Sequence, residues 1–334
     1  MQFRPLGRSG LKVSPLCLGT MMFGGPTDEP TAARIIAHAR DAGVNFIDTA
    51  DAYTAGQSEE ITGRAIAEHR HWWVLATKLA NPTMPGPNGR GASRRHIQYA
   101  IENSLRRLNT DVIDVMYLHK EDPATPLGES VRALADAVRA GKIRYIGLSN
   151  YRVWRVAEIS HLCDAEGIDR PIANQPLYNI LNRQIETELL PACGFYGQGV
   201  VPYSPLARGV LTGKYDPAFP PPQGTRAGRA DRRMMESEWR PESLAIAQQI
   251  AAHARALNLT PGQFAIAWIL NNAFVSAAIG GPRTLEQWEE YLGAVTYKCT
   301  AEDEAFIDAL VAPGHPSTPG YNDPAYPLEG RVAR

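Results

Sequence analysis

SRRHIQYAIENSLRRLNTDVIDVMYLH, residues 93–119, joins a helical pattern to a strand pattern. In its first part apolar residues recur every three or four positions and so share one helix face: Ile97, Ala100, Ile101, Leu105 and Leu108. Ser93 is a typical N-cap for this helix. Residues 113–119 form a nearly continuous apolar run, typical of a strand buried on both faces of a parallel sheet. A helix that leads into such a strand is a repeating unit of α/β proteins.

The same alternation extends through the chain in both directions. Short runs rich in Val, Ile and Tyr occur at residues 14–20, 45–50, 72–78, 113–119, 143–150, 172–178, 200–205 and 275–281. Eight such strands with helical stretches between them predict a (β/α)8 TIM barrel. A doubly wound dinucleotide-binding fold is the main alternative. That fold usually carries G-x-G-x-x-G after its first strand, and the sequence contains no such string.

Both ends of the chain depart from the barrel pattern. Residues 1–13 predict a small hairpin, with Gly7 and Gly10 near its turn, that covers the bottom of the barrel. Residues 312–334 form a tail rich in Pro, Gly and Tyr that lacks a helix or strand signal. We therefore expect a single barrel domain over residues 1–334, with its core at about 14–311.

A long insertion separates the seventh and eighth strands. It begins with an irregular stretch, residues 216–243, and continues with two predicted helices at about 242–258 and 261–272. Long irregular segments are usually either functional or disordered. Residues 223–233 are locally basic, which fits either a mobile solvated loop or a lid attracted to the phosphates of a cofactor. Both interpretations stay open.

Composition excludes several classes of protein. The 334 residues include 34 Lys and Arg against 35 Asp and Glu, so the net charge is −1. Proteins that bind nucleic acids or membrane surfaces usually carry a clustered basic excess, so we expect neither partner. Four widely spaced cysteines, no apolar leader and no membrane-length apolar run predict a reduced, cytoplasmic protein.

Candidate catalytic residues follow three successive predicted strands. Asp48, Lys78 and His119 each end a strand, and Tyr53 lies in the loop after Asp48. In a TIM barrel these strand ends meet at one rim, where active sites form. Taken singly, each residue also has a structural interpretation, such as a rim ion pair or a packed aromatic ring. Together they predict one catalytic site.

This set of side chains suits proton donation to a carbonyl oxygen. A phenol has a reference pKa of about 10, and a nearby ammonium favours its anion. Asp48 can hold Lys78 charged, and a neutral His119 imidazole can hydrogen-bond a substrate oxygen. The matching hydride would come from a reduced nicotinamide cofactor.

Several segments in order resemble the aldo-keto reductase family. They are GVNFIDTADAY with a following SEE, LATK, SLRRLNTDVIDVMYLH, IRYIGLSN, NQPLYN, YSPLARGVLTGKY and IGGPRTLEQ. The resemblance implies a barrel oxidoreductase in which Tyr53 is the general acid/base and Lys78 lowers its pKa. It also implies that Asp48 pairs with Lys78 and that His119 orients the carbonyl group.

The resemblance further implies a site for NADPH or NADP⁺, with NADH less favoured. The residues that match the family's cofactor contacts are Ser149, Asn150 and Gln175 at the carboxamide, Tyr203 on the nicotinamide ring, Ser204, Leu206 and Arg208 along the pyrophosphate, and Gly281, Arg283 and Gln287 near the 2′-phosphate. Guanidinium groups bind phosphate well, which supports the role of Arg283.

Two positions depart from the family pattern. Tyr291 stands where relatives commonly carry an adenine-binding Asn. Lys120, Glu121 and Asp122 follow His119, where many relatives carry an aromatic residue or proline. These charges fit a polar, hydroxyl-bearing substrate or a solvated loop, of which we favour the loop.

We expect an NADPH-dependent carbonyl reductase that acts reversibly on an aldehyde or ketone. One alternative is a cofactor-binding regulatory subunit, like the channel-associated members of the same family. Another is a metal-dependent hydrolase with His119, Asp48 and Asp51 as ligands. Metal sites typically need more convergent ligands than this rim offers, so we expect no metal. The sequence assigns no oligomeric state.

Overall fold

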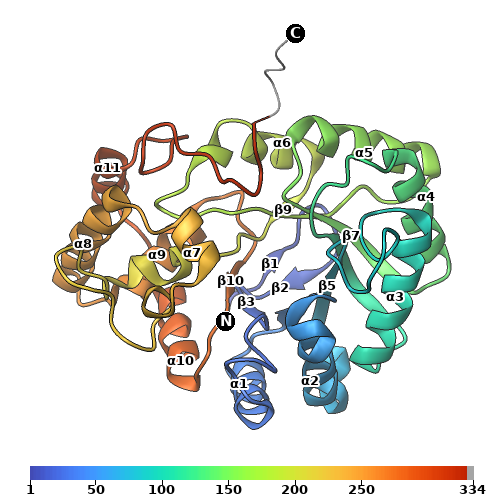
Figure 1. Cartoon of the computed structure of the whole chain (residues 1–334), viewed down its shortest axis with the longest axis horizontal. Helices are drawn as coiled ribbons and strands as arrows, with labels where there is room; N and C mark the ends of the chain where they lie inside the picture. Colours follow the sequence, from blue (N-terminus) through green and yellow to red (C-terminus); the bar gives the residue numbers. More distant parts are fainter. Residues whose placement is uncertain (329–334) are drawn as a thin grey trace.

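The computed structural model describes residues 1–328 and confirms the predicted barrel. Eight parallel strands surround a central axis in the order β10-β3-β4-β5-β6-β7-β8-β9 (Figure 1). They are β3 (Leu16–Gly19), β4 (Phe46–Asp48), β5 (Val74–Leu79), β6 (Ile113–Leu118), β7 (Ile143–Ser149), β8 (Ala173–Gln175), β9 (Gly199–Val200) and β10 (Ala278–Gly280). The barrel closes beside β9, where Val200 forms a parallel bridge with Val275 and the Ser276 amide donates to the Val200 carbonyl at 2.9 Å.

Helices form an outer layer around these strands (Figure 1). They are α1 (Glu29–Asp41), α2 (Gln57–Ile66), α3 (Arg94–Leu108), α4 (Leu127–Arg139), α5 (Val153–Glu166), α6 (Leu189–Tyr196), α7 (Arg232–Ser237), α8 (Pro241–Ala256), α9 (Pro261–Asn271), α10 (Leu285–Gly293) and α11 (Ala301–Leu310). The predicted N-cap of α3 is confirmed, because the Ser93 side chain accepts a hydrogen bond from the His96 amide. No helix within residues 1–328 is long and apolar enough to cross a lipid bilayer.

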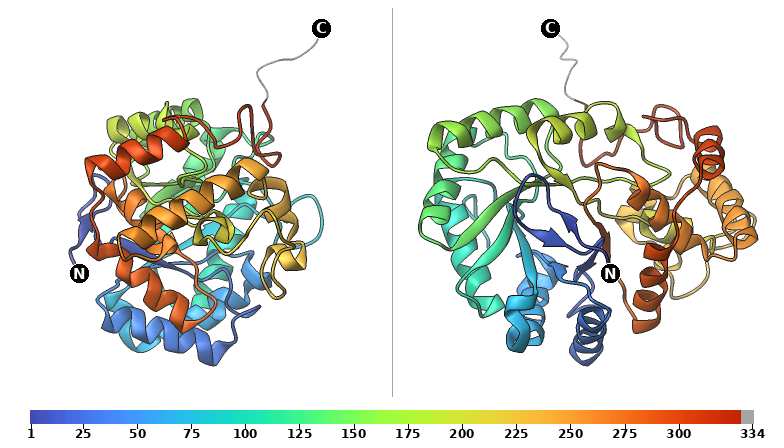
Figure 2. Two further views of the ribbon diagram at one scale, coloured as in Figure 1. Left: turned by 90° about the vertical axis from the view of Figure 1, so that its left-hand side faces the viewer. Right: turned by 180° about the vertical axis from the view of Figure 1, so that it is seen from behind.

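The N-terminal hairpin closes the bottom of the barrel, as predicted. Strands β1 (Arg4–Pro5) and β2 (Lys12–Val13) pair antiparallel, and the view from behind places them in front of the barrel strands (Figure 2). Leu6 and Val13 are fully buried and belong to the same apolar cluster as Phe46, Val115 and Val201 from the strands. The hairpin therefore completes the lower core of the barrel.

Gly7 joins this hairpin to the barrel at a position that excludes other residues. It adopts φ +59, and an added Cβ would lie 2.4 Å from the Ile172 carbonyl oxygen and 2.5 Å from that of Gly197. We expect Gly7→Ala to lower the free energy of unfolding by about 2–4 kcal/mol, measured by urea denaturation. Gly10→Ala is the matched control, because no described atom would lie within 4 Å of its Cβ. Equal losses in both variants would contradict the expectation.

The structure corrects the sequence-based boundaries of several elements. The predicted strands at 172–178 and 200–205 shorten to β8 and β9, because Pro176 and Pro202 have no amide hydrogen for the sheet. In the insertion, the stretch predicted as irregular contains the helix α7, which begins after Asp231; the Asp231 side chain accepts from the Met234 amide at 2.9 Å.

The two helices predicted after that stretch are confirmed as α8 and α9. The tail contains no helix or strand over residues 312–328, as expected, and the rest of the predicted tail lies outside the described residues.

Candidate active site

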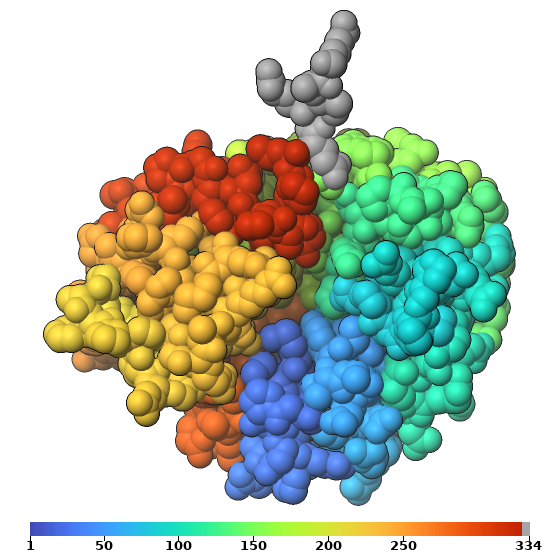
Figure 3. Space-filling view, viewed as in Figure 1, coloured from blue at the N-terminus to red at the C-terminus, as the bar shows by residue number. Residues whose placement is uncertain are grey.

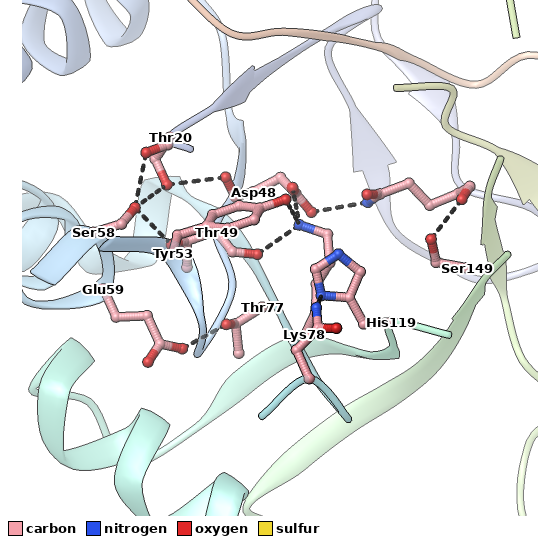
Figure 4. Close-up of polar contacts among 12 residues, drawn as sticks. Thr20, Asp48, Thr49, Tyr53, Ser58, Glu59, Thr77, Lys78, His119 and Ser149 are labelled. Atoms are coloured by element: carbon pink, nitrogen blue, oxygen red, sulfur yellow. Dashed lines mark hydrogen bonds and ion pairs between the residues drawn. The ribbon is translucent and has the colours of Figure 1, made fainter. Parts of the chain in front are cut away.

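A buried ion pair lies at the carboxyl ends of the barrel strands, between β4 and β5. The Lys78 ammonium contacts the Asp48 carboxylate directly and donates to the Thr49 carbonyl at 2.7 Å (Figure 4). The other Asp48 oxygen accepts from Gln175 Nε2 at 2.9 Å. Burial alone lowers the pKa of Lys78, but the charge of Asp48 outweighs it and the pKa lies above its usual value. Lys78 is therefore held as a cation.

Tyr53 lies directly above this pair. It begins the short 3-10 helix η1 (Tyr53–Gly56), in which Thr54 and Ala55 take left-handed conformations with φ of 48° and 55°. Lys78 Nζ is 3.2 Å from the Tyr53 hydroxyl oxygen and donates to it. Burial raises the pKa of Tyr53, whereas Lys78 acts in the opposite direction. The expected lowering effect of Lys78 is present, but in this structure it does not outweigh burial, and the phenol keeps its proton at neutral pH.

His119 completes the predicted catalytic set. It follows β6, and its ring centre lies 5.9 Å from that of Tyr53 at an angle of 80°. Burial first, and then Lys78 and Lys120, hold the pKa of His119 well below its usual value. The imidazole is therefore neutral. The structure thus brings Asp48, Tyr53, Lys78 and His119 together at one rim, as the sequence predicts (Figure 4).

A large cavity opens above these residues. It has a volume of about 860 Å³ and contains Tyr53 and His119 in its wall. In the space-filling view the molecule is hollowed near its centre, where the yellow to red segments face the blue and green ones (Figure 3). The cavity wall includes these predicted cofactor residues: Asn150, Gln175, Tyr203, Ser204, Leu206, Arg208, Gly281, Arg283 and Gln287. Lys78 and Ser149 are buried behind the wall instead.

Polar contacts connect the middle of this wall to the predicted catalytic residues. The Tyr203 hydroxyl donates to Asn150 Oδ1 at 2.8 Å, and Asn150 Nδ2 donates to the His119 carbonyl oxygen at 3.0 Å. Ser149 Oγ donates to the Gln175 carbonyl oxygen at 2.7 Å. Ser149 therefore supports Gln175 from outside the cavity. Asn150 and Gln175, the other two residues predicted to contact the carboxamide, line the cavity itself.

The far end of the cavity is strongly basic. Arg208, Arg226 and Arg283 line it, and none of them forms an ion pair with a carboxylate within residues 1–328. Burial, followed by the neighbouring charges of Arg208 and Arg283, lowers the pKa of Arg226. The buried Nε of Arg208 also has no hydrogen-bond partner among the described residues. Unpaired guanidinium groups in a cavity fit the phosphates of a dinucleotide cofactor.

The backbone before this basic end is unusual. Ser204, Ala207 and Arg208 all have positive φ, between 46° and 55°, although none is glycine. Such conformations cost energy and cluster at ligand-binding segments. Asn179 Nδ2 holds the segment by donating to the Ser204 carbonyl oxygen at 2.9 Å. The segment after β9 is thus held in an unusual conformation before Arg208.

The insertion and the tail both reach the cavity. Arg226 and Arg233 come from the basic residues 223–233, and Tyr326 comes from the tail. Arg233 makes two hydrogen bonds with the Asp323 carboxylate, at 3.0 and 2.6 Å, and so joins the insertion to the tail. This placement favours the interpretation of the insertion as a lid over the interpretation as a free loop.

Sequence reasoning missed several residues of the cavity wall. Asn81 lies three positions after Lys78, where the strand-end rule could have identified it. Lys214 ends the segment GVLTGK and also lines the cavity. No sequence pattern pointed to Tyr326.

The two departures from the family pattern lie in different surroundings. Tyr291 is buried in the cavity wall. Glu121 pairs with Arg152 and Arg155, and Asp122 accepts hydrogen bonds from the Ala92 amide and the Thr125 hydroxyl. Glu121 and Asp122 therefore hold neighbouring loops together, so they are neither freely solvated nor part of the cavity wall.

Asp51 is a buried carboxyl beneath η1. Burial first, and then Glu59, raise the pKa of Asp51 to about 8, although Arg107 opposes them. Because this pKa exceeds the unfolded value of about 3.9, folding favours the neutral form. The contribution of Asp51 to stability is present at low pH and is lost as pH rises from about 4 to about 8.

Within residues 1–328, no cluster of His, Cys, Asp and Glu could hold a metal ion.

Asp51→Asn should remove this dependence on pH. We expect the variant to gain stability relative to the natural protein as pH rises, by up to about 1.4 kcal/mol per pH unit within that window. Urea unfolding at about pH 5 and about pH 9 measures the change. A constant difference between the two proteins at both pH values would contradict the shifted pKa.

Known proteins are similar to this chain along nearly its whole length. Residues 15–312 match the model described as Aldo/keto reductase family. The chain is 38% identical over 337 residues to the "Uncharacterized oxidoreductase YrpG" of Bacillus subtilis, covering 96% of this chain and 99% of that protein. It is 38% identical over 300 residues to the "Probable voltage-gated potassium channel subunit beta" of Arabidopsis thaliana, covering 88% and 91%. It is 33% identical over 340 residues to the "Versiconal hemiacetal acetate reductase" of Aspergillus parasiticus, covering 94% and 98%.

Proposed function

The chain belongs to the aldo/keto reductase family of oxidoreductases, and from that premise we propose that it is an NADPH-dependent carbonyl reductase. Its substrate is an aldehyde or ketone, which it reduces reversibly to an alcohol. The observation that carries the proposal is the contact of Lys78 with both Asp48 and the Tyr53 hydroxyl, at the floor of a cavity whose far end is basic.

Each catalytic side chain has a separate task in this proposal. When bound, NADPH supplies the hydride for the carbonyl carbon. Tyr53 donates its phenolic proton to the carbonyl oxygen, and Lys78 stabilises the phenolate that remains. Asp48 keeps Lys78 charged and oriented, and neutral His119 holds the carbonyl oxygen by a hydrogen bond.

The remaining residues would hold the cofactor. Asn150 and Gln175 offer amide groups beside the catalytic residues, and the ring of Tyr203 lies in the same wall. Arg208 and Arg283 would bind phosphate oxygens, and Arg226 would reach the same phosphates from the insertion. Tyr291 offers a ring next to Arg283 in place of the more usual asparagine.

A carbonyl screen tests the proposal. The purified protein is mixed with NADPH and a panel of aldehydes, sugars and alicyclic ketones, and cofactor oxidation is followed by its absorbance. We expect turnover with at least one class of carbonyl compound. Failure with every class, in protein that binds NADPH, would contradict the proposal.

Arg283 provides a test of cofactor preference. Its backbone is fixed, because its amide donates to Gln287 Oε1 at 2.8 Å and its carbonyl accepts from Thr27 Oγ1 at 3.0 Å. We expect Arg283→Met to weaken NADPH binding by about tenfold to hundredfold and to leave NADH binding nearly unchanged. Fluorescence titration with both cofactors measures this. An equal loss of affinity for NADPH and NADH would contradict the assigned contact between Arg283 and the 2′-phosphate.

A second candidate function is cofactor-dependent regulation of a partner protein. The favouring observation is the similarity to a protein named as a potassium channel subunit. The complete set of Asp48, Tyr53, Lys78 and His119 favours catalysis instead. Tight NADPH binding without turnover, together with a stable complex with another protein, would favour regulation.

A further inference from the structure

His119 has a side-chain partner that the catalytic scheme does not yet use. Its Nδ1 atom lies 2.9 Å from Nδ2 of Asn81, in the loop that follows β5. Both residues belong to the wall of the cavity. His119 is also fixed through its backbone, because its amide donates to the Leu79 carbonyl and its carbonyl accepts from Asn150.

The identity of the facing atom determines which imidazole nitrogen carries the proton. A neutral imidazole has one N–H group and one lone pair, and an amide nitrogen can only donate. An amide turned the other way would present Oδ1 and place the proton on Nδ1. With Asn81 Nδ2 facing the ring, Nδ1 carries the lone pair and the proton is on Nε2. Only this tautomer has a donor free to reach a substrate.

We propose that Asn81 is a positioning residue that holds His119 in the Nε2–H tautomer, so that His119 donates a hydrogen bond to the carbonyl oxygen beside Tyr53. The inference rests on the proposed carbonyl reduction, because the Nε2–H group of His119 acts as a hydrogen-bond donor to the substrate in that reaction. In the other tautomer the Nε2 lone pair would face the carbonyl oxygen and repel it.

The backbone before Asn81 is held in an unusual conformation. Ala80 has φ +107, in a region that residues other than glycine rarely adopt, and it is buried. Such conformations cost energy and persist only where the surroundings hold them. Here the Ala80 carbonyl accepts from the Gly91 amide at 2.9 Å. The strained residue thus stands directly before the side chain that meets His119.

Two substitutions separate this role from simple packing. Asn81→Leu keeps a similar volume but removes the donor, so both tautomers become accessible. Asn81→Asp keeps the shape but presents only acceptors, and therefore selects the proton on Nδ1. In Asn81→Asp the doubly protonated imidazole still donates from Nε2, and this donor is lost once the ring becomes neutral.

Nitrogen NMR of the full-length protein measures the tautomer directly. The eight histidines are labelled with ¹⁵N, and comparison with His119→Gln identifies the His119 signals. In the natural protein without cofactor or substrate, we expect a neutral ring protonated at Nε2. In Asn81→Asp we expect protonation at Nδ1 and a titration of His119 at higher pH than in the natural protein.

Kinetics provide a second readout. We expect Asn81→Leu to lower kcat/KM by about threefold to tenfold with NADPH binding unchanged. Asn81→Asp should retain activity at low pH and lose it as pH rises through the His119 titration, which a purely structural defect would not produce. A natural protein protonated at Nδ1 would overturn the inference, as would an Asn81→Asp variant with unchanged tautomer and pH profile.

The two proposals fail separately. The tautomer of the natural protein is measured without substrate, so a proton on Nδ1 would overturn the role of Asn81 even if a variant does not fold. A protein with the Nε2–H tautomer that reduces no carbonyl compound would contradict the proposed function. A protein that reduces carbonyls with the Nδ1–H tautomer would contradict only the inference on Asn81.

Discussion

Tyr53→Phe should lower kcat for carbonyl reduction by about 100-fold to 10,000-fold, the usual contribution of a general acid. The substitution removes one oxygen atom, the one that accepts a hydrogen bond from Lys78 at 3.2 Å. The ring itself remains beside His119, so the shape of the cavity changes little. We therefore expect the loss in kcat, with the affinity for NADPH unchanged.

Initial rates and fluorescence titration of NADPH measure the two quantities separately. Tyr99→Phe is a suitable control, because Tyr99 is an exposed tyrosine on α3, outside the barrel. It should retain full activity. Full activity in Tyr53→Phe would exclude Tyr53 as the proton donor, and a large loss of NADPH binding would indicate a structural defect instead.

Lys78→Met should damage both stability and catalysis. It leaves the Asp48 carboxylate buried without its cation, and the side chain of Asp48 is only 3% exposed. Removing one partner of a buried ion pair typically costs about 3–5 kcal/mol. The Tyr53 phenolate also loses the positive charge that stabilises it. The rate of reduction should therefore fall, in addition to the free energy of unfolding.

A double variant separates these two effects. Lys78→Met combined with Asp48→Asn contains no buried charge at this position and should regain most of the lost stability. It should not regain activity, because no cation remains beside Tyr53. Urea denaturation and initial rates measure both properties. Recovery of activity in the double variant would show that the positive charge of Lys78 is not needed for proton donation.

Residue patterns in the sequence predict which side chains meet at the rim more reliably than the edges of the elements. Each of Asp48, Lys78 and His119 ends an apolar strand, and the topology of a barrel brings such ends together. The ends of β8 and β9 are harder to predict from the sequence, although Pro176 and Pro202 give a local signal for them. The apolar pattern continues past these prolines, and the pattern alone extends the strands too far.

Other features depend on contacts between distant segments. Tyr326 reaches the cavity because Asp323 in the tail meets Arg233 in the insertion, 90 positions away in sequence. The contact of Asn81 with His119 comes directly after Ala80, whose positive φ cannot be predicted from its being an alanine. The net pKa of Tyr53 depends on how completely it is buried, which is a property of the folded chain.

The pairing of β3 with β10 has a consequence for how the chain reaches its folded state. Residues 16–18 pair with residues 278–280, so the barrel cannot close until most of the chain has left the ribosome. At about 5–20 residues per second, the edge of β3 stays without its neighbour for many seconds. Contacts this distant in sequence slow folding, and an unpaired strand edge favours aggregation. Chaperone capture of the nascent chain should therefore be strongest before residue 280 emerges.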